Sequence, residues 1–253
     1  MNDFNPAYGR SRADALDMSV DAGLRGFMLG VYNKLGLGLV LSAALAFATS
    51  SVPAVRDVMF NVTESGRFAG YTGIGTIVTF APIVLLFGSM FMMRNPTARG
   101  ASLLYWGVVA SIGASLGVVG LVYTGQSIAQ AFVITSASFF GLSLFGYTTK
   151  RDLGPIGTFL FMGLIGLVLA SLALMFFPGA ASPAMMFAFN AIGVLIFAGL
   201  IAWDTQRLKL MYAQTAGSAE AMSVAQSYGA LSLYINVVNL FRFILAFVGV
   251  SRN

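Results

Sequence analysis

Residues 183–203 read PAMMFAFNAIGVLIFAGLIAW and contain no charged side chain. About 20 apolar residues in a helix are enough to cross the hydrocarbon core of a bilayer. This run therefore predicts a transmembrane helix. The next residue is Asp204, within the sequence WDTQRLK (203–209). An acid at such a boundary is costly unless it has a partner, water or a proton, so Asp204 is the first candidate functional residue.

A second interpretation of Asp204 needs no function. The predicted helix would simply end here, with Asp204 among solvated lipid headgroups and paired to Arg207 one turn further on. The isolated segment does not decide between these interpretations.

The whole chain has the composition of an integral membrane protein. Hydrophobic residues make up 58% of its 253 residues and charged residues 9%, and the mean hydropathy is +0.84. So few polar groups could not cover the surface of a soluble protein of this size. The apolar runs are continuous rather than alternating, which favours helices over a β-barrel.

Seven apolar segments predict an all-α fold, a bundle of seven transmembrane helices. They cover Val31–Thr49, Tyr71–Met93, Ala98–Tyr123, Ile128–Tyr147, Pro155–Phe177, Pro183–Trp203 and Gln226–Val250. Residues 1–24 are too charged for the membrane and are predicted to form a cytoplasmic tail. Residues 25–253 are predicted to form one transmembrane domain, within which Gly113 and Gly117 have the spacing of a close helix contact.

The distribution of basic residues predicts the orientation. With the N-terminus in the cytoplasm, nine basic residues lie inside: Arg10, Arg12, Arg25, Arg94, Arg99, Lys150, Arg151, Arg207 and Lys209. Arg56, Arg67 and Arg252 lie outside. This bias indicates a cytoplasmic N-terminus and an outer C-terminus. It also accounts for the basic excess, so no nucleic-acid partner is expected.

Missing residue types exclude several kinds of active site. The chain has no histidine and no cysteine, which excludes Ser-His hydrolysis, histidine metal sites, thiolate nucleophiles and disulfides. No lysine lies in the seventh segment, where a retinal Schiff base would be expected, and no phosphate-binding GxxxxGK[ST] sequence occurs. We therefore expect a protein that is not an enzyme and has no cofactor.

The last segment carries a polar stripe. Its residues are separated by four, four, three and three positions and so share one helix face: Tyr228, Ser232, Asn236, Asn239 and Arg242. A polar face is unfavourable in lipid, so it should point into protein or a wet cavity. Two interpretations stay open: hydrogen bonds that join helices, or a path for ions with Asp204 as its acidic element.

Two segments resemble the C-terminal signature of the Bax inhibitor-1 family, also called the transmembrane Bax inhibitor motif family. They are WDTQ (203–206) and ALSLYINVVNLF (230–241). In number and spacing of spans the similarity covers roughly residues 26–249. The resemblance implies six helices around a central seventh, and a pH-sensitive calcium leak. In that family, aspartates on the sixth and seventh helices share a proton and latch a pore, and one of them meets an arginine of the second helix.

By position, the resemblance assigns the sixth-helix aspartate to Asp204 and the arginine to Arg94. The seventh-helix aspartate falls on Asn236, where many members have Asp. Two neighbouring carboxylates can share a proton, whereas an amide has no titrating proton. A single aspartate would therefore carry any response to pH here.

The predicted function is a pH-influenced calcium leak channel of the inner membrane, gated by contact between Asp204 and Arg94. Calcium would be the transported ion, and the bilayer the immediate partner. The alternative is a non-conducting protein that modulates a membrane partner, such as a membrane protease, as the resemblance implies for some bacterial relatives.

Overall fold

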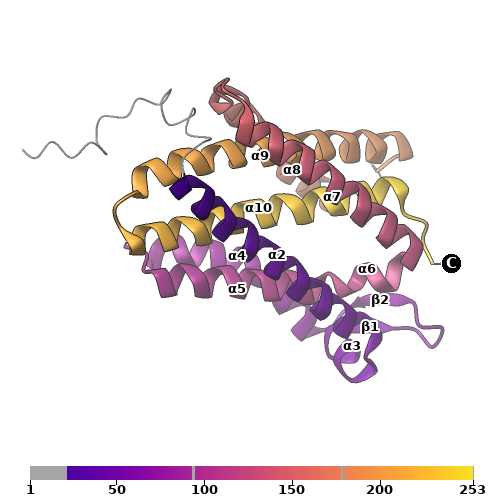
Figure 1. Cartoon of the computed structure of the whole chain (residues 1–253). Coiled ribbons are helices and arrows are strands. Elements are labelled where there is room, and N and C mark those ends of the chain that lie inside the picture. The colour runs from indigo at the N-terminus through magenta and orange to yellow at the C-terminus, as the bar shows by residue number, and fades with distance from the viewer. Residues whose placement is uncertain (1–21, 93–94, 178, 180, 253) are drawn as a thin grey trace, which may run out of the picture. The chain divides into compact units, whose positions relative to one another are not determined.

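The computed structural model of the chain describes residues 22–92, 95–177, 179 and 181–252 (Figure 1). Its elements in chain order are α2 (Ala22–Ser51), α3 (Pro53–Met59), β1 (Phe60–Val62), β2 (Phe68–Tyr71), α4 (Gly73–Met92), α5 (Ala98–Ser115), α6 (Gly117–Val122), α7 (Gly125–Thr148), α8 (Gly154–Phe176), α9 (Pro183–Thr215) and α10 (Ala219–Val248).

Seven stretches of helix in the described part of the chain are long and apolar enough to cross a membrane. They are α2, α4, α5 with α6, α7, α8, α9 and α10. Their number and order confirm the all-α fold with seven spans that the sequence predicts.

Two boundaries and one connection differ from the prediction. Helix α2 begins by Ala22 rather than Val31, because Leu24, Phe27 and Met28 are already buried in protein contacts. Helix α9 continues to Thr215 instead of ending near Trp203. The connection between the first two spans is structured as well, since it forms α3 and the antiparallel β1–β2 hairpin.

The described chain separates into two compact units, each of which is considered by itself. The first, called the α4–α5 unit, contains residues 29–129, 218–234 and 249–252. The second, called the α8–α9 unit, contains residues 22–28, 130–217 and 235–248. The first half of helix α10 belongs to the α4–α5 unit, and its second half belongs to the α8–α9 unit. Its most apolar window is 50% buried, the largest share among the seven spans described, as expected for a central helix.

Close packing of α2 against α5 and α6 organises the α4–α5 unit. A Cβ atom added to Gly113 would lie 2.6 Å from the Cα of Ser42, too close for any side chain. The hydroxyl of Thr49 donates to the carbonyl of Ala114 at 2.9 Å, and a side chain on Gly117 would collide with Thr49. The predicted close helix contact at these two glycines is therefore confirmed.

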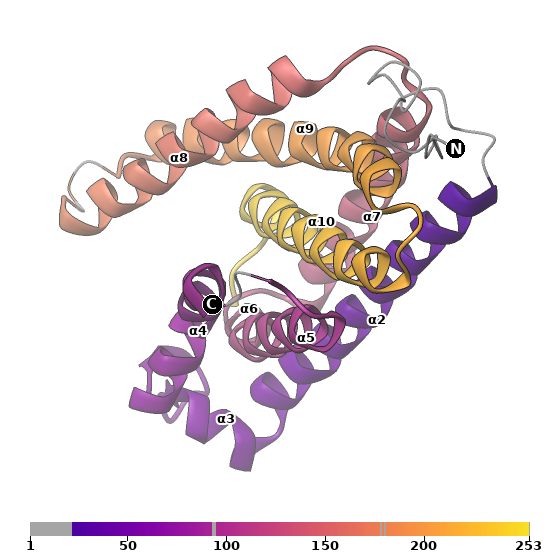
Figure 2. The same cartoon turned by 90° about the vertical axis from the view of Figure 1, so that its left-hand side faces the viewer.

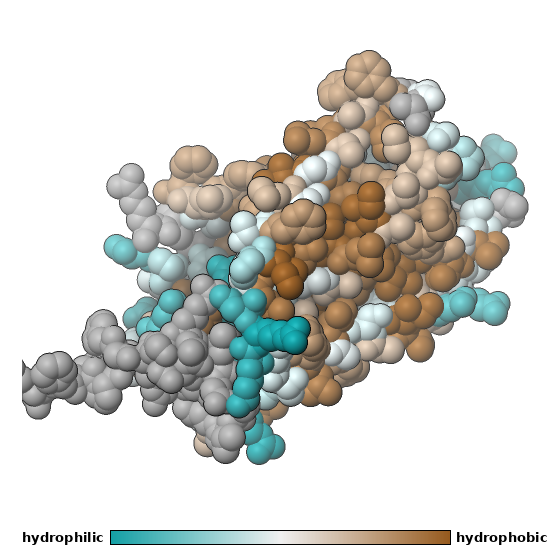
Figure 3. All heavy atoms as spheres, turned by 90° about the horizontal axis from the view of Figure 1, so that it is seen from above, coloured by the Kyte–Doolittle hydropathy of each residue, from teal (hydrophilic) through white to brown (hydrophobic). Residues whose placement is uncertain are grey.

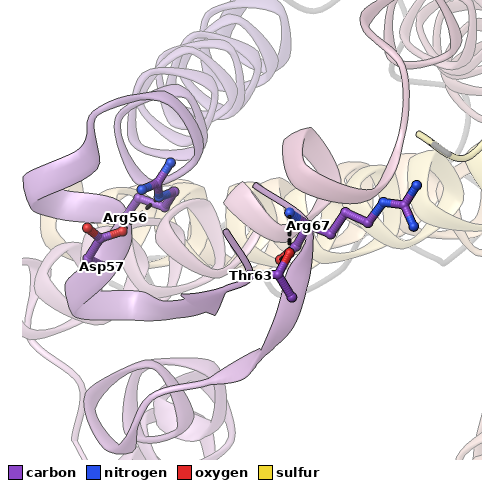
Figure 4. A network of polar contacts seen from close by, with 4 residues as sticks. All are labelled: Arg56, Asp57, Thr63 and Arg67. Carbon is purple, nitrogen blue, oxygen red and sulfur yellow. Dashed lines mark hydrogen bonds and ion pairs between the residues drawn. The ribbon is translucent and has the colours of Figure 1, made fainter. Parts of the chain in front are cut away.

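The α3–β1–β2 segment follows the end of α2 (Figure 2). The rings of Phe60, Phe68 and Tyr71 pack on one another with centroids 5.2–5.9 Å apart. Figure 4 shows its polar contacts: an ion pair of Arg56 with Asp57 at 2.8 Å, and a bond from the Arg67 amide to the hydroxyl of Thr63 at 3.1 Å. These are solvent-facing contacts, which contribute little to stability.

The C-terminal end lies beside this segment within the same unit. Ser251 forms a β-bridge with Tyr123, and the guanidinium of Arg252 donates to the carbonyl of Gly120 at 3.0 Å. Leu121, next to Gly120, packs in one cluster with Phe60 of β1. These contacts bring three parts of the chain together: the first connection, the end of α6 and the C-terminal end. In a protein with seven spans, all three should lie on the same side of the membrane.

In the α8–α9 unit, α8 and α9 run side by side (Figures 1 and 2). Gly157 of α8 lies against the indole of Trp203, and Phe243 of α10 stacks on Phe197 of α9 at 5.6 Å. Most of α8 is exposed, since only 6% of its apolar window is buried. Hydrophobic side chains dominate the face seen in Figure 3, and hydrophilic ones gather towards its edges. Exposed apolar side chains of this kind suit contact with lipid.

Candidate functional site at Asp204

Asp204 lies inside α9 and not at its end. It is 5% exposed, and the helix continues beyond it to Thr215. The interpretation of Asp204 as a solvated helix end is therefore wrong. Hydropathy could not reveal this, because the helix remains buried in protein after the apolar run has ended.

Asn236 of α10 meets Asp204 directly. Its amide Nδ2 donates to Oδ2 of Asp204 at 2.7 Å, and Asn236 is itself 6% exposed. A hydrogen bond to a carboxylate is roughly twice as strong as one between neutral groups, and low-dielectric surroundings strengthen it further. This bond joins the sixth and seventh spans within the α8–α9 unit. Arg94, the other predicted partner of Asp204, lies outside the described residues.

The other members of the polar stripe differ in their surroundings. Tyr228 and Ser232 are half-buried in the α4–α5 unit. Asn239 is half-buried in the α8–α9 unit, and its amide donates to the carbonyl of Ile235 at 2.9 Å, on its own helix. Arg242 is exposed. Among the stripe residues, Asn236 has a hydrogen bond to Asp204 in the described part of the chain.

Gln206 of α9 forms hydrogen bonds with the connection between α7 and α8. It is 2% exposed, its Oε1 accepts from the amide of Leu153 at 2.8 Å, and its Nε2 donates to the carbonyl of Arg151 at 2.7 Å. Both ends of the Gln206 side chain therefore hydrogen-bond to backbone groups of the loop.

Lys209 is fully buried and binds the end of α7. Its Nζ donates to the carbonyl of Tyr147 at 2.7 Å and lies 5.8 Å from the centre of the Tyr147 ring. The last carbonyls of a helix lack partners in the helix and carry partial negative charge, which a cation stabilises. Lys209 thus caps α7 from α9.

Successive residues of WDTQRLK therefore contact different elements. Trp203 packs on α8, Asp204 on α10, and Thr205 lies 3.3 Å from the hydroxyl of Ser143 on α7. Because successive helix positions turn by about 100°, one short segment can hold three neighbouring helices. Hydropathy and the family resemblance point to Asp204 but not to Gln206 or Lys209. The sequence does indicate that the helix continues, because the apolar residues Leu208 and Tyr212 follow at helical spacing. Both are buried in the structure.

Comparison with known protein families assigns the chain to one of them. The family profile described as "Inhibitor of apoptosis-promoting Bax1" matches residues 24–253. The chain belongs to the Bax inhibitor-1 family. The match covers all seven spans and the WDTQRLK segment, so the resemblance inferred from two short motifs is confirmed.

Relatives within the Bax inhibitor-1 family come from several bacteria. An uncharacterized protein of Caulobacter vibrioides is 59% identical over the full length of both chains. The inner membrane protein YbhL of Escherichia coli is 38% identical over 91% of this chain and 94% of its own. Protein RP147 of Rickettsia prowazekii is 40% identical over 92% and 93%. With its seven apolar helices, the chain is a multi-pass inner membrane protein of this family.

Replacing Gln206 by leucine should lower the free energy of unfolding by about 2 kcal/mol, because the loop loses two hydrogen bonds and the buried Leu153 amide loses its partner. Thermal unfolding of the full-length protein in detergent measures the effect. Gln214→Leu is the matched control, since Gln214 lies on the same helix but is exposed. Equal melting temperatures for the two variants would show that water replaces Gln206 at the loop.

Proposed function

We propose that the protein is a calcium-permeable leak of the inner membrane, gated at Asp204. The observation that carries this proposal is the buried hydrogen bond of Asp204 with Asn236. Ionisable groups inside membrane proteins are rare because they are costly, and they commonly mark ion pathways. A role in transport rather than catalysis also fits the absence of histidine and cysteine from the sequence.

The chemistry of this pair suits a gate for a hard cation. Ca²⁺ binds carboxylate and amide oxygens, and Asp204 and Asn236 supply both kinds. While Asn236 donates to Asp204, the carboxylate is engaged between two helices. An arriving cation would compete for the same oxygens and so loosen the link between α9 and α10. One carboxylate binds Ca²⁺ weakly, which favours passage over storage.

The response to pH would come from Asp204 alone, because Asn236 does not titrate. Protonation would remove the charge that strengthens the bond to Asn236 and would weaken the closed state. The family resemblance adds Arg94 as a second contact that holds Asp204 closed. Both contacts would be lost together when the carboxylate is neutral.

Calcium flux into liposomes tests this function. Purified protein, reconstituted in vesicles that contain a fluorescent calcium indicator, should carry Ca²⁺ faster than protein-free vesicles. The alternative is a non-conducting membrane protein that modulates a partner such as a membrane protease. That function predicts vesicles as tight as the protein-free ones, and a partner that is retained when the protein is purified from membranes.

The proposed orientation places the N-terminus in the cytoplasm and the C-terminus outside. The basic residues support this assignment. An alkaline phosphatase fusion after Asn253 should be active, whereas a fusion after Ser218, in the connection between α9 and α10, should be inactive. Activity at Ser218 and not at Asn253 would invert the topology.

A further inference from the structure

One side of α10 becomes more exposed towards the end of the helix at Val248. Residues separated by four, three and four positions form a line along this side, which we call the open face: Ile235, Asn239, Arg242 and Ala246. The first two are half-buried, and the last two are exposed. On the opposite side, Val237, Leu240 and Ile244 are only 1–6% exposed.

The open face starts at the candidate site. Ile235 directly precedes Asn236, whose amide donates to Asp204, and all of these residues belong to the α8–α9 unit. A helix rises by about 1.5 Å per residue, so Arg242 lies roughly 9 Å along the axis from Asn236. Arg242 is also the one charged residue in the sequence from 235 to 248.

Water suits the open face better than lipid does. Asn239 lies nine residues before Val248, the last residue of α10. That is about 13 Å along the axis, too far for its short side chain to reach the lipid headgroups. Its Nδ2 donates to the carbonyl of Ile235, and its Oδ1 accepts no hydrogen bond from the residues that the structure describes. A polar atom without a partner is costly in hydrocarbon, and water would supply that partner.

Arg242 brings a permanent positive charge to the open face, because a guanidinium stays protonated at physiological pH. Among the described acidic residues, none forms an ion pair with Arg242. Its charge therefore repels cations that approach along this face. The repulsion energy is twice as large for a divalent ion as for a monovalent ion.

We propose that Arg242 is an electrostatic barrier, which slows cations on their way along the open face to the Asp204–Asn236 pair. This inference rests on the proposed calcium leak and adds a residue that sets its rate and its ion preference. For charges about 10 Å apart in water, Coulomb's law predicts that the barrier slows Ca²⁺ about fourfold and K⁺ about twofold. A change in the closed state at Asp204 would instead alter both rates by the same factor.

Ion flux into liposomes tests this barrier. Vesicles of equal protein content contain an indicator for either Ca²⁺ or K⁺. At low salt, Arg242→Gln should raise Ca²⁺ flux about fourfold and K⁺ flux about twofold. Arg242→Lys keeps the charge and should restrain both ions as arginine does. The control Arg67→Gln, which removes an exposed arginine between β1 and β2, should change neither flux.

Salt provides a second readout. The screening length falls from about 30 Å at 0.01 M to about 3 Å at 1 M ionic strength. Added choline chloride should therefore bring Arg242→Gln and the natural chain to nearly equal rates, because the charge of Arg242 is then screened.

Three results would overturn the barrier: unchanged Ca²⁺ flux in Arg242→Gln, equal factors for Ca²⁺ and K⁺, or a difference that persists in full at high salt. If the natural chain conducts Ca²⁺ in these experiments, the proposed leak still stands. A natural chain as tight to Ca²⁺ as protein-free vesicles would overturn both the leak and the barrier.

Discussion

Replacing Lys209 by methionine should lower the free energy of unfolding by about 3 kcal/mol, which corresponds to a melting temperature lower by roughly 6–12 °C. Lys209 is fully buried, and its Nζ donates to the carbonyl of Tyr147 at 2.7 Å. Methionine fills a similar space but donates nothing, so the end of α7 would lose its cap. The cation beside the Tyr147 ring would be lost as well.

The control is Lys150→Met, because Lys150 is an exposed lysine on the connection that follows α7. Both variants remove one positive charge, and they differ in burial. Unfolding of the full-length protein in detergent, followed by circular dichroism, compares them. Unchanged melting of Lys209→Met would contradict the capping role, since a buried charge exchanged for a well-packed apolar group is neutral when no hydrogen bond depends on it.

Replacing Asn236 by aspartate should reverse the pH dependence of calcium flux. In the natural chain, protonation of Asp204 weakens its bond to Asn236, so flux should rise towards acid pH with a slope of about one proton. In the variant, two carboxyl groups would occupy the ends of a 2.7 Å contact. Such a pair shares a proton and stays joined at low pH, then repels when that proton leaves. Flux through the variant should therefore rise towards alkaline pH.

Flux between about pH 5 and pH 8 in vesicles of equal protein content measures this reversal. The nearby charged residues of α9, Arg207 and Lys209, are the same in both proteins and cancel in the comparison. Asn239→Asp is the matched control, because Asn239 bonds to its own helix at Ile235 and not to Asp204. Identical profiles for the natural chain and Asn236→Asp would show that positions 204 and 236 are uncoupled in conduction.

Hydropathy predicts the number and order of the spans because each apolar run of about 20 residues must cross the membrane as a helix. It fails where polar residues are buried in protein instead of lipid. That is why the sixth span was predicted to end at Trp203, although Asp204, Gln206 and Lys209 continue into the interior of the α8–α9 unit. The α3–β1–β2 segment was also missed, because strands of three and four residues have no measurable periodicity.

The pairing of Asp204 with Asn236 was predictable, whereas the contacts of Gln206 and Lys209 were not. Helical spacing and the family resemblance selected Asp204 and Asn236, and the structure joins them. The same spacing grouped Asn236 with Arg242, yet one is buried and the other exposed. Residues on one face of a helix meet different surroundings along its length, and spacing carries no information on depth. Gln206 and Lys209 were missed because their partners are backbone carbonyls and amides, which leave no pattern in the sequence.

Calcium flux through Asp204→Asn tests the central claim, that Asp204 holds the leak closed. Asparagine keeps an oxygen for Asn236 but lacks the charge, so the closed state should weaken by about 1.4 kcal/mol and flux at neutral pH should rise about tenfold. Asp57→Asn is the control, because Asp57 is 57% exposed and its ion pair with Arg56 lies at the surface. Reconstituted in the same vesicles, this control should carry Ca²⁺ at the rate of the natural protein. Flux through Asp204→Asn that equals or falls below that rate would contradict the claim.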